Sequence, residues 1–99
     1  MTNATPAALT IPLAEVLDLK AASVLASDLL AARGADVALD GSAVQRLGGQ
    51  CLQVILSARA TWEKEGARLK IINPSDDLVE GLELLGADPA HYCAKEAHL

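Results

Sequence analysis

The sequence predicts an α/β domain: a small sheet of parallel or mixed strands with about three helices packed on it. Short apolar segments alternate along the chain with longer segments of helical periodicity, which is the order that parallel strands with crossover helices require. The 99 residues are enough for one domain with a single core. Seventeen Leu and nineteen Ala without any Phe favour thin helices that lie close to the sheet.

The first half of the chain contains two predicted strands on either side of a helix. Residues 9–13 alternate apolar and polar side chains, and Pro12 places this strand at a sheet edge or a strand end. Asp18 is the expected N-cap of a helix that runs to about Arg33. Residues 36–40 have the length and apolar character of a buried central strand.

The second half repeats this order after a loop over residues 41–49. A helix is expected from Gln50 to Gly66, a strand over residues 68–73, and a last helix that begins after Ser75 as its N-cap. The apolar stripe of the middle helix predicts that these residues face the core: Cys51, Ile55, Ala58 and Trp62.

The charge and aromatic content exclude several classes of partner. The net charge is −5, and the eight Lys and Arg are scattered along the chain, so no basic surface is predicted for nucleic acid. No apolar segment is long enough to span a membrane, and the amino terminus lacks the pattern of a signal peptide. We therefore expect a cytoplasmic protein with two reduced cysteines and a protein partner.

The residues that carry chemistry form no catalytic set, so we expect neither an enzyme nor a bound cofactor or metal. The adjacent glycines Gly48 and Gly49 match no nucleotide-binding pattern and are better explained by a helix start. Cys51 heads an apolar stripe, which favours a core thiol over a reactive thiolate. His91, Cys93 and His98 match no zinc spacing and are expected to be ordinary surface residues of a tail. The acids near the last helix are expected to be solvated.

The stretch from Asp40 to Leu52 resembles the loop and helix start of STAS domains, the fold shared by bacterial anti-anti-sigma factors and the cytoplasmic tails of sulfate transporters. The family pattern D-l-s-x-v-x-x-i-D-S-[SAT]-G-L aligns without a gap with D-G-S-A-V-Q-R-L-G-G-Q-C-L. The downstream pattern also fits: a helix that ends at a glycine, the strand L-K-I-I, and N-P-S at the start of a helix that closes on L-L-G. The resemblance covers about residues 9–88 and implies a STAS-like fold. It divides the chain into a leader (1–8), the domain (9–88) and a carboxyl-terminal tail (89–99).

The chain departs from the family pattern at the position that is phosphorylated in anti-anti-sigma factors. Gly48 replaces the family's Asp, Gly49 replaces the first Ser, and Gln50 stands at the phosphoacceptor position. The first strand of the family's amino-terminal hairpin is short or missing, which leaves a sheet edge bare or covered by a partner. Glutamine has no hydroxyl to phosphorylate, so the resemblance implies that this switch is lost.

The remaining loop and helix start have two equally supported interpretations. One is a docking site for a partner protein, with partner-binding residues Gln45, Arg46, Gly48, Gly49, Gln50 and Gln53. The other is a glycine turn that only reverses the chain. The resemblance implies a signalling partner for such a docking site, an ATP-binding kinase of the anti-sigma type or a chemotaxis histidine kinase. The alternative function is that of a STAS subunit in an ABC-type lipid transporter assembly. A small-ligand module has the least support.

Overall fold

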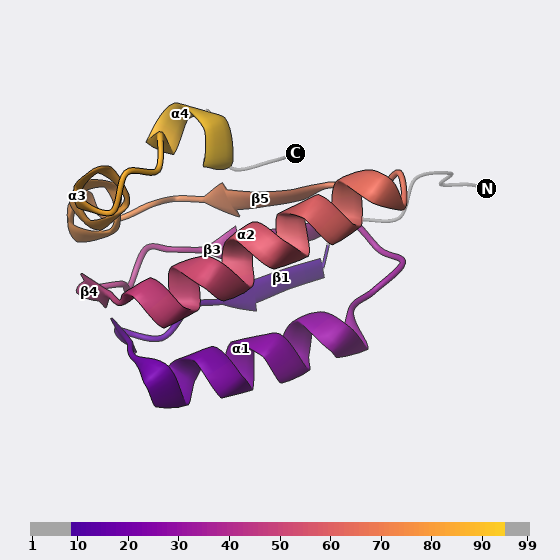
Figure 1. Ribbon diagram of the computed structural model, residues 1–99, viewed down its shortest axis with the longest axis horizontal. Helices are drawn as coiled ribbons and strands as arrows, with labels where there is room; N and C mark the ends of the chain where they lie inside the picture. Colours follow the sequence, from indigo (N-terminus) through magenta and orange to yellow (C-terminus); the bar gives the residue numbers. More distant parts are fainter. Residues whose placement is uncertain (1–8, 95–99) are drawn as a thin grey trace.

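A computed structural model describes residues 9–94 (Figure 1). Its elements, in chain order, are β1 (Leu9–Pro12), β2 (Val16–Leu17), α1 (Leu19–Ala31), β3 (Val37–Asp40), β4 (Arg46–Leu47), α2 (Gly49–Lys64), β5 (Leu69–Ile72), α3 (Asp76–Leu84) and α4 (Pro89–Tyr92). The alternating strands and helices confirm the predicted α/β class. The predicted N-caps are also present: Asp18 accepts the Ala21 N–H at 2.9 Å, and Ser75 accepts the Leu78 N–H at 3.0 Å.

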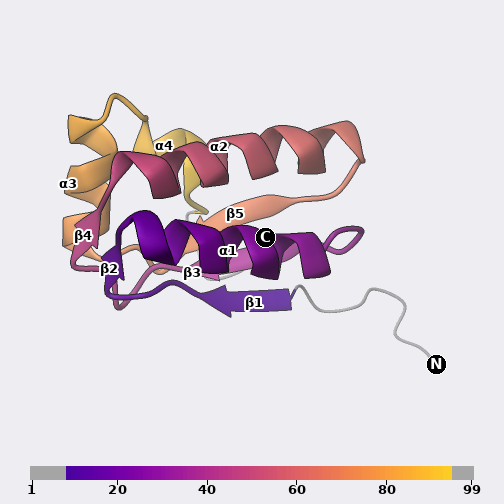
Figure 2. The ribbon, with the colours of Figure 1, turned by 60° about the horizontal axis from the view of Figure 1, so that its bottom comes forward.

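The sheet has the order β1-β3-β5, and both pairings are parallel. Each crossover moves one strand further in the same direction, so α1 and α2 cover the same face of the sheet (Figures 1 and 2). The order of these three strands does not reverse, so residues 9–94 contain no switch point of the kind at which doubly wound folds bind nucleotides. β3 lies in the centre, as the apolar character of residues 36–40 predicted.

The core lies between the helices and one face of the sheet. Its deepest side chains come from both layers, with Val37 and Leu39 fully buried in β3 and Leu78 and Leu82 fully buried in α3. Trp62 is 2% exposed and Cys51 is buried, so the stripe predicted for the middle helix does face the core.

Two short strands form a second parallel pair: one lies just before the predicted N-cap Asp18 and the other lies inside the predicted loop over residues 41–49. β2 follows β1 and β4 follows β3, and Val16 pairs with Arg46 while Leu17 pairs with Leu47. Two-residue strands carry no periodicity, which is why the sequence did not predict them. The pairing brings the starts of α1 and α2 side by side.

The carboxyl-terminal segment differs from the predicted tail, because residues 89–94 pack on the domain. Asp88 caps the short helix α4, the Tyr92 ring lies 4.9 Å from the Arg59 guanidinium, and the Ala94 N–H donates to the Ile71 carbonyl at 2.8 Å. Asp before Pro is itself a helix-start signal. The leader (1–8) and the last five residues lie outside the described part of the chain.

Candidate functional site

The candidate site is the first turn of α2, which the β2–β4 pair holds against the start of α1. The Gly48 N–H donates to the Leu17 carbonyl at 2.8 Å, and the Gln45 N–H donates to the Glu15 carbonyl at 2.7 Å. The loop before α2 therefore has a fixed backbone. Gly48, the N-cap residue of α2, offers no side-chain hydrogen bond to the helix, so the first-turn N–H groups have no capping side chain.

The two adjacent glycines differ in what surrounds them. A Cβ on Gly48 would lie 2.8 Å from the Leu17 carbonyl oxygen, closer than real Cβ atoms approach. A Cβ on Gly49 would have no heavy atom within 4 Å. The turn interpretation therefore explains Gly48, because the close approach of β2 leaves no room for a side chain. It does not explain Gly49, whose surroundings are open.

Beside this turn, a groove of about 360 Å³ runs between α1 and α2. Gln50 and Gln53 line the end of the groove near the helix start, and the Arg33–Glu65 ion pair lies at the other end. The walls between these ends are mostly apolar or small: Ala26, Leu29, Leu30, Val54, Ser57, Ala58, Thr61 and Trp62. The α1 wall was absent from the sequence prediction, because only the tertiary structure places α1 beside α2.

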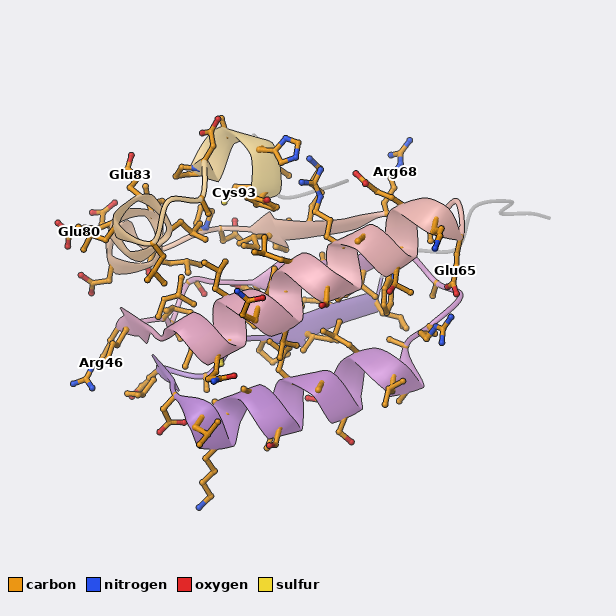
Figure 3. The ribbon with its side chains drawn as sticks, viewed as in Figure 1. Arg46, Glu65, Arg68, Glu80, Glu83 and Cys93 are labelled. Carbon is orange, nitrogen blue, oxygen red and sulfur yellow. The ribbon has the colours of Figure 1, made fainter. Side chains whose placement is uncertain are left out.

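The remaining predicted residues lie on the other side of the same turn. Gln45 precedes β4 and Arg46 begins it; both are exposed, and Arg46 points outward at the end of the molecule that carries Glu80 and Glu83 (Figure 3). The six predicted residues thus surround the first turn of α2, with Gly48 half-buried at its base and the other five exposed. We call these six residues the α2 docking surface; their role in binding stays a prediction.

A family model described as "Mlab, STAS domain" matches residues 1–90. The chain belongs to the STAS domain family. No curated protein is significantly similar to it. The match confirms the resemblance drawn from the loop and helix-start pattern. Membership indicates a regulatory or transporter-associated role, and STAS domains are generally not enzymes.

Gln50, which the resemblance to STAS domains places at the phosphoacceptor position, lies exposed in the first turn of α2. Ser42 is the nearest hydroxyl before it in the loop, and its N–H donates to the Asp40 carboxylate at 3.0 Å. This hydrogen bond lowers the pKa of Asp40. Ser42 therefore belongs to the turn that follows β3.

Cys51, also in the first turn of α2, has the properties of a core thiol. Its side chain is buried, and Sγ lies 3.3 Å from the Asp18 carbonyl oxygen, to which the thiol donates. Burial raises the pKa of Cys51, and the nearby Asp18 carboxylate raises it further. Burial also raises the pKa of Cys93, but this thiol is only partly buried. Both shifts disfavour the thiolate in the folded protein.

We expect a thiol reagent at pH 8 to modify Cys93 well before Cys51 in the folded protein. The reaction rate depends on access of the reagent to the thiol and on the thiolate population. Cys51 is buried and its pKa is raised, so both factors slow its reaction. Mass spectrometry of partly labelled protein measures the order, with Cys93→Ser as the single-thiol control. Labelling of Cys51 in that variant at the rate seen in urea would contradict its burial.

Two properties of the described residues bear on other functions. Residues 9–94 contain no group of three or more side chains placed to hold a metal ion. His91 is exposed and Cys93 is half-buried, whereas His98 lies outside the described residues. No helix in the described part of the chain is long and apolar enough to cross a membrane.

Proposed function

We propose that this STAS protein is a non-enzymatic regulatory adaptor that binds a signalling partner through the α2 docking surface. The partner class is an ATP-binding kinase of the anti-sigma or chemotaxis type. The observation that carries the proposal is Gln50, a neutral side chain exposed at the phosphoacceptor position beside an open apolar groove. The protein therefore binds its partner without a phosphorylation switch of its own.

The chemistry of this surface suits a neutral loop or helix end of another protein. Gln50 and Gln53 each carry a donor and an acceptor, so they can match either group on a partner backbone. Gly49 has no side chain, and a Cβ built there would meet nothing within 4 Å, so this residue does not obstruct the first-turn N–H groups. The groove adds apolar area next to these polar groups, as protein interfaces commonly do.

The absent hydroxyl also favours a second candidate, a STAS subunit of an ABC-type lipid transporter. A structural subunit needs a permanent contact, and a phosphate of −1.5 to −2 charges would disturb such a contact. The two candidates differ in the partner: a kinase in one case and a transporter ATPase in the other. Binding assays of the purified protein with a kinase and with a transporter ATPase, both encoded in the same genome, separate the two candidates.

We expect Gln50→Glu to weaken partner binding by at least about tenfold, because it places a charge where the partner contacts neutral groups. The stability of the domain should not fall, since an acid in the first turn of a helix is favourable. Isothermal titration with the purified partner measures the effect. Ala90→Glu adds the same charge at the exposed start of α4, outside the α2 docking surface, and should leave binding unchanged, whereas Gly49→Trp should block it.

Incubation with the kinase and ATP provides the second half of this test. We expect the kinase to bind the protein without phosphorylating residues 42–57. Stoichiometric phosphate on Ser42 or Ser57, found by mass spectrometry, would refute the proposal of an adaptor without a switch. Equal binding by Gln50→Glu and the unchanged protein would place the contact elsewhere.

A further inference from the structure

The outer side of α1, away from α2, is an unpartnered helix face. In Figure 1, α1 lies at the lower border of the molecule with α2 above it, and no element among the described residues lies below it. Lys20, Val24 and Asp28 follow one another at intervals of four residues and form one stripe on this side. Val24 is 58% exposed, and both charged neighbours are exposed.

We propose that a second copy of this chain docks on the stripe, about a two-fold axis that passes beside Val24. An axis perpendicular to α1 makes the two α1 helices antiparallel, so position i of one copy faces position 48 − i of the other. Val24 then faces Val24 of the second copy, and Lys20 faces Asp28 of the second copy twice. The stripe is therefore complementary to itself in charge.

The charges on the stripe have no partner within the described residues. The two ion pairs found there are Arg33–Glu65 and Arg59–Glu63, so neither Lys20 nor Asp28 is neutralised in this way. The spacing of these two residues places opposite charges at equal distances from Val24. This charge complementarity identifies a second copy, rather than an unrelated protein, as the occupant.

The surroundings of Val24 can accept the same residue from the second copy. A hollow of about 160 Å³ lies between α1 and β1 and includes Val24 and Asp28 in its lining. The rest of the lining is apolar: Ile11, Pro12, Leu13, Ala14, Leu17, Ala21 and Leu25. Ser27 and Ala31 are small neighbours on α1 and let a second helix approach closely. Two helices whose ridges of residues four apart interdigitate cross at about −50°.

The test measures the dimer dissociation constant by sedimentation equilibrium at low salt for the full chain and four variants. Lys20→Asp and Asp28→Lys each turn two attractions into two repulsions, so we expect each to weaken the dimer by about fivefold to tenfold. The double variant restores opposite charges across the axis and should regain the original dissociation constant. Val24→Glu places two like charges at the axis and should abolish the dimer.

The outcomes are distinct because the three substituted residues all lie at exposed positions. Circular dichroism and urea unfolding check that each variant keeps its fold. A single helix face gives a small interface, so we expect an affinity near the weak end of specific complexes, reduced further by salt. A monomer at every concentration up to about 1 mM, which corresponds to about −4.1 kcal/mol, would overturn the proposal. A dimer that the double variant fails to restore would also overturn it. Neither result bears on the α2 docking surface, which lies across α1 from the stripe.

Discussion

Trp62→Ala is expected to lower the free energy of unfolding by about 3–5 kcal/mol. Trp62 is 2% exposed and packs in the core from the last part of α2. Its Nε1–H donates to the Ala35 carbonyl at 2.7 Å, which ties α2 to the segment before β3. The truncation therefore opens a large cavity and leaves a carbonyl without its donor.

Urea unfolding followed by circular dichroism measures this loss. Trp62→Phe is the matched control, because it removes the hydrogen bond and retains much of the ring packing; its loss should be smaller. Trp62 is the only tryptophan, so the unchanged protein also reports burial through its fluorescence. A native emission maximum equal to that in urea would contradict the buried site.

Gly48→Ala and Gly49→Ala are expected to change stability in opposite directions. The first should cost about 1–3 kcal/mol, because its Cβ would press on the Leu17 carbonyl oxygen and disturb the β2–β4 pair. The second should gain about 0.5–1 kcal/mol, because Gly49 begins α2 in open surroundings, where Ala is the better helix former.

The same substitution at neighbouring positions makes each variant the control for the other. Both change the unfolded chain equally, so the difference between their unfolding free energies reports the folded state. Thermal unfolding by calorimetry measures both values. Two stabilised variants would show that β2 does not approach Gly48 as closely as the structure has it.

The sequence alone determined the features that depend on neighbours along the chain. The N-caps Asp18 and Ser75 are local hydrogen bonds, and the structure has both. Burial of Cys51 and Trp62 follows from helical periodicity, because a helix places residues of that spacing on one side. The central strand followed from its unbroken apolar run. The STAS fold followed from the order of these elements together with one loop pattern.

Only the tertiary structure decided the features that depend on residues distant in sequence. The β2–β4 pair joins two loops about thirty residues apart, and neither strand is long enough to have a pattern of its own. That pair leaves no room for a side chain at Gly48, whereas the space around Gly49 is open, although both residues are glycines. Packing of residues 89–94 rests on contacts with Arg59 and Ile71. The groove beside Gln50 exists because two helices from separate crossovers lie on the same face of the sheet, and each contributes one wall.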